Sequence, residues 1–391
     1  MAGRAGLSKT NQMDNASCEK ILPSSRTATA YTAIEDETLA VEMLWKELQP
    51  RENQGLIFFS SPDYNFSKLH LEFTKRFEGP ILGCSTAGQI SRAGFSNDGI
   101  CAILLPSDVA LHTVNIRLDK PEPGIQEAEE FVQNLADHKT NYAVAVLLID
   151  GLSLQEEFIA SRLDEVLSYV TLVGGSAGDN LQFNQTTVCS RSACGSNLAV
   201  LGFLTSNKPI IPFKFNHFDA TDKLLVVTEA DTATRTLNKI NGMPAARAYS
   251  EALGLTVEEL GASVWSCNPI LVKIAGQTFV RSIQSVNKDD SLTLYCAIDE
   301  GVILSIAEST DVMSAAEDGF HQARNQLTGF ELDAVIGFDC ILRKLEFSET
   351  NTIQQIEKIY SENNVLGFST YGEQYNGIHI NQTFTGILLG A

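Results

Sequence analysis

One short turn motif occurs three times in the chain, and this repeat limits the possible folds more than any other feature. The segments 83–89 (GCSTAGQ) and 367–373 (GFSTYGE) share Gly, Ser, Thr and Gly at matching positions, and 175–179 (GSAGD) is a shorter variant. Each copy follows a strand-like run, and another such run comes soon after it. Gly and Ser/Thr permit a tight turn and place hydroxyls and backbone amides at a sheet end. The repeat predicts recurring strand–turn–strand units, whose turns are either purely structural or hold a small polar ligand.

Helix and strand patterns alternate along the rest of the chain. Between residues 41 and 48, four apolar residues have the i, i+3, i+4, i+7 spacing of an amphipathic helix, which Pro50 ends. Short apolar runs rich in β-branched and aromatic residues predict strands. The predicted fold class is α/β, with mixed sheets, packed helices and an internally repeated two-part architecture. The predicted strands include 55–60, 100–105, 142–149, 197–205, 270–274, 277–286, 292–298 and 332–340, and further helices are predicted at 128–135, 312–327 and 353–360.

The length and apolar content predict more than one domain. Domains usually contain ~100 to 200 residues, and this chain has 391 residues, of which 44% are hydrophobic. Residues 1–30 are rich in polar and small residues without a hydrophobic period, which predicts a disordered leader. We place two folded domains at 31–225 and 226–391, because a new strand begins near residue 226 and an Asn-Gly turn follows it.

Composition excludes several classes of protein. The start of the chain has no apolar run, and longer apolar stretches such as 142–149 fall short of the ~20 residues that a bilayer requires. We therefore predict a soluble cytoplasmic protein without membrane insertion. The 48 acidic and 28 basic residues give a net charge of -20, and no Lys/Arg-rich run interrupts this field. Such a surface repels phosphate backbones, so we predict no binding of nucleic acid.

The turn motifs and several other segments together resemble the FIST family of sensory proteins. The segments that carry the resemblance are 83–88 (GCSTAG), 241–246 (NGMPAA), 338–343 (FDCILR), 367–374 (GFSTYGEQ) and 377–386 (GIHINQTFTG). The resemblance implies a FIST N-like domain at 31–225 and a FIST C-like domain at 226–391. It also implies a cytoplasmic ligand-binding sensor that is not an enzyme and acts with signal transduction partners. A homo-oligomer would be compatible with such a role.

A narrower resemblance is to the NosP proteins, the haem-based nitric oxide sensors of that family. It lies in the segments 216–218 (NHF), 225–231 (LVVTEAD) and 339–343 (DCILR). The resemblance implies a b-type haem (haem b) that binds nitric oxide and a partner histidine kinase whose activity the sensor changes. The haem would be bound without covalent attachment, because the chain contains no Cys-x-x-Cys-His.

A non-covalent haem needs an axial ligand on an apolar wall, because the macrocycle buries a large disc around its iron. His217 alternates with Phe213 and Phe215, so on a strand all three share one apolar face. We therefore select His217 as the iron ligand. Haem propionates require a cation nearby, and Arg281 or Arg343 could supply it. His112 also alternates with apolar residues and is an alternative ligand, although a histidine on such a face is more often a hydrogen-bonded core residue.

His379 belongs to a different environment. Its period-two neighbours Asn381 and Thr383 make a polar strand face that comes just after the third turn motif. The alternative hypothesis is therefore a non-haem sensor that binds a small polar metabolite, such as an amino acid. His379 is also an alternative iron ligand. The alternative pocket consists of Ser85, Thr86, Ser369, Thr370 and His379.

Two further patterns give little support to other functions. The segment 174–178 matches the G-x-S-x-G nucleophile elbow, but no helical pattern follows it and no acid or histidine stands out as a triad partner. A serine hydrolase is therefore the weakest alternative, and we predict no catalytic residue. Cys189 and Cys194 have no partners at zinc-finger spacing and are predicted to be ordinary thiols.

Overall fold

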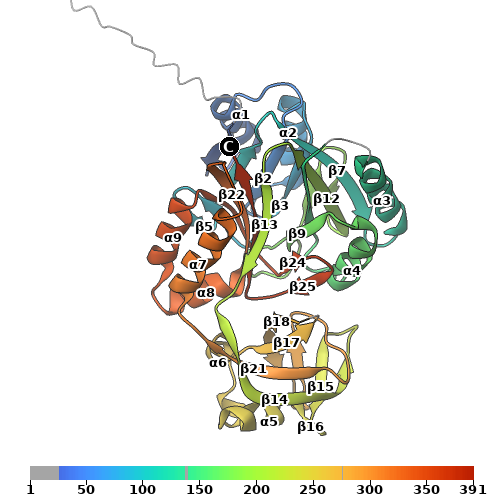
Figure 1. Ribbon diagram of the computed structural model, residues 1–391, viewed down its shortest axis with the longest axis vertical. Coiled ribbons are helices and arrows are strands. Elements are labelled where there is room, and N and C mark those ends of the chain that lie inside the picture. Colours follow the sequence, from blue (N-terminus) through green and yellow to red (C-terminus); the bar gives the residue numbers. More distant parts are fainter. Residues whose placement is uncertain (1–25, 137–139, 275) are drawn as a thin grey trace, which may run out of the picture.

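The computed structural model describes residues 26–136, 140–274 and 276–391 (Figure 1). The fold is mixed α/β, as predicted. Most of the predicted leader lies outside the described residues, but its last residues belong to strand β1 (Ala28–Thr32), so the leader was predicted too long. Within the described ranges, no helix is both long and apolar enough to cross a bilayer.

Three copies of one supersecondary unit form the main body. In each copy, two neighbouring parallel strands are connected through helical structure, and the second of them leads into one of the turn motifs. A hairpin follows the turn. A return strand then pairs antiparallel with the first parallel strand and with the strand that begins the unit. The motif noticed in the sequence therefore marks a repeat of the whole unit.

The elements of the three units have the following bounds. The first unit contains β1, α1 (Glu37–Leu48), β2 (Leu56–Ser60), α2 (Phe66–Arg76), β3 (Ile81–Ser85), β4 (Gln89–Ser91), β5 (Gly94–Ser96) and β6 (Ile100–Leu104). The second contains β7 (Val109–Arg117), α3 (Glu122–Ala136), β8 (Tyr142–Ile149), α4 (Glu156–Leu167), β9 (Thr171–Ser176), β10 (Val188–Ser190), β11 (Cys194–Gly195) and β12 (Leu198–Ser206). The third contains β13 (Ile210–Phe215), α7 (Val312–Arg324), β22 (Leu332–Cys340), α8 (Ile341–Glu349), α9 (Ile353–Glu362), β23 (Val365–Thr370), β24 (Glu373–Tyr375), β25 (Ile378–Ile380) and β26 (Phe384–Gly390).

Each hairpin leaves its own unit and extends the sheet of another. The hairpin β4–β5 pairs with β23 of the third unit, β10–β11 pairs with β3 of the first, and β24–β25 pairs with β9 of the second. The three six-stranded sheets are β1-β6-β2-β3-β10-β11, β7-β12-β8-β9-β24-β25 and β13-β26-β22-β23-β4-β5. Every sheet therefore contains strands of two units.

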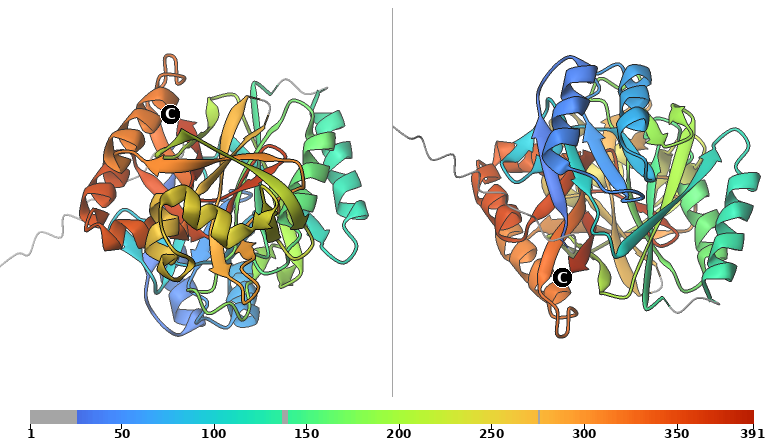
Figure 2. Two further views of the ribbon diagram at one scale, coloured as in Figure 1. Left: turned by 90° about the horizontal axis from the view of Figure 1, so that it is seen from below. Right: turned by 90° about the horizontal axis from the view of Figure 1, so that it is seen from above.

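The three sheets enclose one apolar core, and the helices lie on the outside of the body (Figure 2). Near its centre, the ring centroid of Phe59 lies 4.6 Å from that of Phe368 and 6.5 Å from that of Phe338. Val146 and Val173 bring the second unit into the same core. Because the units share one core, the turn motifs at the ends of their strands are brought together.

A small domain interrupts the third unit between β13 and α7 and lies below the main body in Figure 1. It has its own apolar core, and its two ends pair with each other, because Phe218 lies opposite Ser309. The predicted boundary between residues 225 and 226 falls inside its first strand, and residues 310–391 return to the main body. The small domain consists of β14 (Phe218–Asp231), β15 (Thr236–Ile240), β16 (Met243–Pro244), α5 (Ala245–Leu253), a 3₁₀ turn (Val257–Glu259), α6 (Ala262–Cys267), β17 (Ile270–Ile274), β18 (Gln277–Arg281), β19 (Ile283–Val286), β20 (Leu292–Leu294) and β21 (Ile303–Ser309).

The prediction for one cysteine pair was wrong. Cys189 and Cys194 form a disulfide across the β10–β11 hairpin, where they occupy directly opposite positions. Residues opposite each other on neighbouring antiparallel strands bring their side chains together. The sequence spacing alone did not reveal this hairpin, and the two residues were therefore interpreted as ordinary thiols.

Candidate functional site

The three turn motifs meet in the main body and form a closed ring of backbone hydrogen bonds. The first motif bonds to the third, the second to the first, and the third to the second. This ring accompanies the hairpin exchange, because in each unit the hairpin that follows the turn motif joins the sheet of another unit. The bonds that close the ring include Ala87 N–H to Ser369 O (3.0 Å), Gly178 N–H to Ser85 O (3.1 Å) and Ser176 N–H to Gly372 O (2.8 Å).

The polar residues predicted for the alternative pocket lie in or beside this ring, but they do not line one common space. Ser85 borders a cavity, and its Oγ accepts a hydrogen bond from Thr187 N–H at 2.9 Å. Thr86, Ser369 and Thr370 are completely buried. The Thr86 hydroxyl donates to a backbone carbonyl, and the Thr370 hydroxyl donates to Glu373. Thr86 and Thr370 therefore serve mainly to hold the turns.

The cavity beside Ser85 has a volume of about 430 Å³ and is lined mainly by polar residues. It lies at the amino end of α2, where Asn65 caps the helix by accepting from Lys68 N–H at 3.1 Å. Asp179 of the second motif is its only charged residue among the described lining. We call this space the polar cavity. It is lined by Pro62, Tyr64, Asn65, Phe66, Ser67, Ser85, Asp179, Gln182, Asn184, Gln185, Thr187, Cys194 and Gly195.

Asp179 keeps its negative charge although it is buried. Burial acts to raise its pKa, but hydrogen bonds from the Tyr371 hydroxyl and from the backbone N–H groups of residues 183–185 outweigh that effect and lower the pKa. Tyr371 belongs to the third motif. The charge in the polar cavity is therefore coupled directly to the ring of turns.

The pKa of Glu373, which ends the third motif, is shifted in the opposite direction from that of Asp179. Glu373 is completely buried, and burial raises its pKa well above the usual value. The nearby Asp339 carboxyl raises it further, whereas the hydrogen bonds from Thr370 and from Thr383 N–H oppose the shift. The protonated form of Glu373 is therefore favoured in the folded protein.

Replacing Glu373 with glutamine, which has the shape of the protonated acid, is expected to preserve stability near neutral pH. A carboxyl group whose pKa rises on folding stabilises the native state fully below its unfolded pKa of ~4.3, and this stabilisation is lost as the pH rises toward the folded pKa. Urea titrations at several pH values give the free energy of unfolding of the wild type and of Glu373→Gln. The wild-type value minus the variant value should decrease as the pH rises from 4 to 8. The exposed Glu349→Gln serves as the control. A difference that grows with pH would contradict the assignment.

His379 lies beside the ring, at the contact between the main body and the small domain. It is buried, and its Nδ1 lies 3.1 Å from Gln374 Nε2. The same Gln374 amide donates to Ser176 Oγ at 2.9 Å. The carbonyl oxygen of His379 accepts from Arg281 of the small domain at 3.1 Å. Burial lowers the pKa of His379 to about 4, so the ring is neutral at physiological pH.

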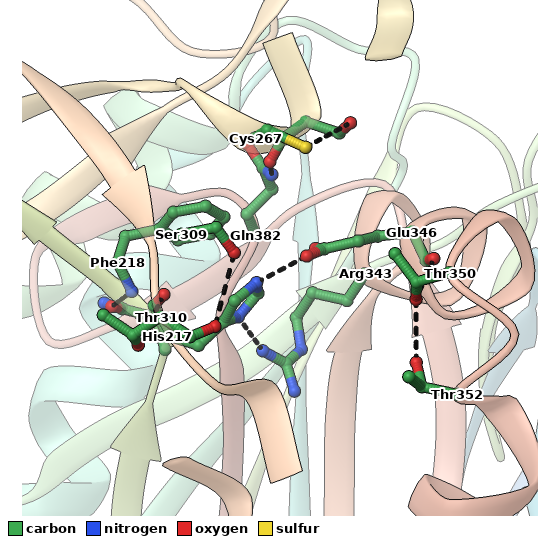
Figure 3. A network of polar contacts seen from close by, with 12 residues as sticks. His217, Phe218, Cys267, Ser309, Thr310, Arg343, Glu346, Thr350, Thr352 and Gln382 are labelled. Atoms are coloured by element: carbon green, nitrogen blue, oxygen red, sulfur yellow. Dashed lines mark hydrogen bonds and ion pairs between the residues drawn. The ribbon is translucent and has the colours of Figure 1, made fainter. Parts of the chain in front are cut away.

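His217 occupies the connection into the small domain, and both of its ring nitrogens have partners (Figure 3). Nε2 lies 2.8 Å from Glu346 Oε1, and Arg343 donates to Nδ1 at 3.1 Å. Because Arg343 can only donate, Nδ1 accepts and the proton lies on Nε2. Burial lowers the pKa of His217, which favours this neutral form. In this arrangement neither ring nitrogen has a lone pair available for iron.

The chain of polar contacts continues beyond His217. Arg343 Nε donates to Asp339 Oδ1 at 2.7 Å, and the Tyr360 hydroxyl donates to Asp339 Oδ2 at 2.7 Å. Arg343 and Asp339 are both completely buried. The guanidinium group predicted to bind haem propionates is therefore engaged in holding β22, α8 and the entry to the small domain together.

The apolar face predicted for haem is filled by side chains. Phe213 and Phe215 lie on β13, as the alternation predicted, but both pack against Phe320 and Phe384, with ring-centroid distances of 5.0–5.8 Å. These residues belong to a continuous core. The residues around His217 therefore do not fit a haem as they are arranged here.

The small domain contains a larger, mostly apolar cavity of about 630 Å³, which we call the apolar cavity. Arg281 and Lys273 lie in its wall, but its described lining includes no His, Cys, Met or Tyr that could bind haem iron. Its remaining lining residues are Ala220, Thr221, Leu224, Leu271, Val272, Ile274, Thr278, Ala297, Ile298, Asp299, Val302, Ile303, Leu304 and Ser305.

Two other residues singled out in the sequence lie apart from these spaces. His112 is exposed on β7 and stacks on Phe131, with ring centroids 4.4 Å apart. Ser176, the serine of the nucleophile-elbow pattern, is completely buried and bonded to Gln374 rather than to a histidine. No helix follows it directly, since the next regular element is β10. The geometry of Ser176 gives no support to a serine hydrolase.

Sequence reasoning missed several residues of the candidate sites. Asn65 and Ser67 were not selected, although an Asn shortly before a helical pattern is a typical N-cap. Glu157 and Cys296, which lie near His379, were missed because they are distant from it in sequence and belong to different elements.

Comparison with protein families divides the chain into two matched segments. Residues 54–243 match the model of the FIST N domain, and residues 245–376 match the model of the FIST C domain. No curated protein is similar enough to be matched. The two segments meet within the small domain, next to the turn between β15 and β16.

Proposed function

Since the chain belongs to the FIST family of signalling sensor domains, we propose that it senses a small zwitterionic metabolite of the amino-acid class in the polar cavity. One observation carries the proposal. The cavity brings together Ser85 of the first motif, the charged Asp179 of the second and the amino end of α2. Its volume of about 430 Å³ lies within the usual range for small-molecule sites.

The chemistry of the lining suits a ligand with both charges. The first N–H groups of a helix have no partners within the helix and attract a carboxylate. The negative charge of Asp179 attracts an ammonium group, and Asn184, Gln185 and Thr187 supply amide and hydroxyl groups for the remaining polar atoms. Because the Tyr371 hydroxyl donates to Asp179, a ligand bound at this carboxylate would change the contact between Asp179 and the ring of turns. The ring contacts the small domain through His379, so the change can reach that domain. Signalling requires that the ligand favour one of two such arrangements.

Filling the polar cavity is expected to weaken binding at least tenfold without affecting the fold. Ser67 is exposed on the first turn of α2 and lines the cavity, so Ser67→Phe would occupy it. Ser348→Phe, at an exposed position of α8, is the matched control. Isothermal titration of the wild type with the standard amino acids identifies the ligand, and the two variants are then titrated with it. Equal affinity in both variants, or no binding by the wild type, would refute this site.

The haem-based detection of nitric oxide is the second hypothesis, which the NosP resemblance motivates but the packing around His217 does not favour. The visible absorption spectrum of the purified protein, before and after haem reconstitution, tests it. A stoichiometric Soret band that shifts with nitric oxide and disappears in His217→Ala would establish it. The packing leads us to expect no such band.

The output is proposed to pass to a partner protein, with a histidine kinase as the first candidate. Autophosphorylation of a kinase encoded beside this protein would be measured with the sensor alone and with the sensor plus its ligand. A change that depends on the ligand, and that Ser67→Phe abolishes, is expected.

A further inference from the structure

Three residues with metal-binding side chains come together where α4, the small domain and β25 meet. They are Glu157, Cys296 and His379, and one potential ligand atom from each lies within 4.8 Å of the other two. Cys296 and His379 are buried, and Glu157 is half-buried. Carboxylate, thiolate and imidazole are the usual ligands of Zn²⁺. Ligands of one tetrahedral zinc lie about 3.5 Å apart, since its bonds are ~2.0–2.3 Å long, so small side-chain movements would complete the site.

Polar atoms around these residues lack partners among the described residues. They are His379 Nε2 and Asn381 Nδ2, and both residues are 99% buried. Buried polar atoms without a partner destabilise the fold and are rare in native proteins. Two of them, on residues that are two positions apart, indicate that something absent from the protein chain binds there.

The histidine can present the lone pair that a metal needs. Its Nδ1 faces the Gln374 amide at 3.1 Å. Turning the Gln374 amide over would place its oxygen next to Nδ1, where it accepts the Nδ1 proton. Nε2 would then carry the free lone pair. An amide or carbonyl oxygen on the second nitrogen is the usual way in which proteins orient a metal-binding histidine.

We propose that Glu157, Cys296 and His379 form a zinc site that joins the small domain to the main body. The fourth position is taken by a water molecule, which accepts a hydrogen bond from Asn381 Nδ2. This site is separate from the polar cavity, and the inference does not depend on the proposed function. Its role is to hold the small domain against α4 and the third unit's hairpin, next to the ring of turns.

Loss of the thiol proton offsets one of the two positive charges that a divalent ion brings to the site. Glu156 and Glu157 both bond to Arg235 at 2.7 Å, and Arg281 bonds to the carbonyl of His379. Without metal, an ordinary thiol is protonated at neutral pH. In the binding step the S–H bond breaks, a sulfur–zinc bond forms and one proton passes to solvent. Zinc binding should therefore release close to one proton per ion at neutral pH.

The test uses the full chain without a histidine tag, freed of metal by a chelator and kept under mild reduction. Co²⁺ is added first, because a cobalt–thiolate bond gives a charge-transfer band that reports the sulfur ligand directly. Zn²⁺ is then added to displace it, and a pH indicator measures the protons released. Cys296→Ser and His379→Gln are compared with Cys267→Ser, which removes an exposed free cysteine. Circular dichroism confirms that each variant is folded.

One Co²⁺ per chain is expected, with a thiolate band that Zn²⁺ removes, that persists in Cys267→Ser and that is lost in Cys296→Ser. His379→Gln should weaken binding at least tenfold. No thiolate band in the wild type would overturn the proposal, as would a band that Cys267→Ser abolishes or Cys296→Ser retains. Ser67→Phe should leave the band unchanged, so the proposals for the zinc site and for the polar cavity can be refuted independently.

Discussion

Replacing Gly367 with alanine is expected to prevent the protein from folding stably. Gly367 begins the third turn motif on β23 and lies opposite Gly337 of β22. A Cβ atom at this position would lie 1.8 Å from the carbonyl oxygen of Gly337, which belongs to a central strand and cannot move without distorting the sheet. Overpacking costs ~1–3 kcal/mol where side chains can adjust. Because the obstacle here is backbone, we expect the loss in unfolding free energy to exceed ~3 kcal/mol.

Soluble yield and urea unfolding measure this effect. Gly195→Ala is the matched control, since a Cβ atom there would meet no atom within 4 Å and the residue has no positive φ. The control should behave like the wild type. If Gly367→Ala were soluble and within about 1 kcal/mol of the wild type in unfolding free energy, the close approach of β22 and β23 would not be what requires glycine in the motif.

Replacing Arg343 with alanine is expected to lower the free energy of unfolding by ~3–5 kcal/mol. Arg343 is completely buried and bonds to both Asp339 and His217. Its removal leaves the Asp339 carboxyl buried, with the Tyr360 hydroxyl as its one remaining side-chain partner among the described residues. Burial already raises the pKa of Asp339, so losing the cation would raise it further and favour its protonation.

A second variant separates the ion pair from simple loss of volume. Combining Arg343→Met with Asp339→Asn removes both charges and retains much of the packing, and it should cost less than Arg343→Ala alone. Lys358→Ala, which removes an exposed ion pair on α9, should have little effect. Urea titrations monitored by tryptophan fluorescence and circular dichroism provide the comparison. A double variant less stable than Arg343→Ala would mean that the charges themselves stabilise the fold.

The repeated motif and the local patterns predicted much of the fold. The strands at 142–149 and 332–340 are present as predicted. The helix at 156–167 was not predicted, although its buried residues Ile159, Leu163 and Leu167 have the spacing of an amphipathic helix. The hairpin exchange was also not predictable, since periodicity reports which face of a strand is buried but not which strand lies next to it.

The candidate sites were less predictable than the fold. Alternation placed Phe213 and Phe215 on β13, but His217 lies beyond the end of that strand. Periodicity could not show that Arg343 and Glu346 reach its imidazole from α8. The local sequence pattern is the same for a buried histidine with two protein partners and for a buried histidine with a free nitrogen. His379 was predicted on a polar strand face just after the third motif, as part of a ligand pocket, and in the structure its Nδ1 lies next to the Gln374 amide. Its neighbours Glu157 and Cys296 come from segments that only the folded chain brings together.

The exchange of hairpins also sets the order in which the protein can be completed during synthesis. The second sheet begins with β7 and lacks its final hairpin until residues 373–380 have been made. At a synthesis rate of ~5–20 residues per second, the edge of β9 remains unpaired for on the order of ten seconds or more after β12 has been made. An unpaired edge strand invites pairing with other chains throughout that time. Nascent chains of this protein should therefore depend on chaperones until translation is almost finished, and those stalled before β24 should aggregate.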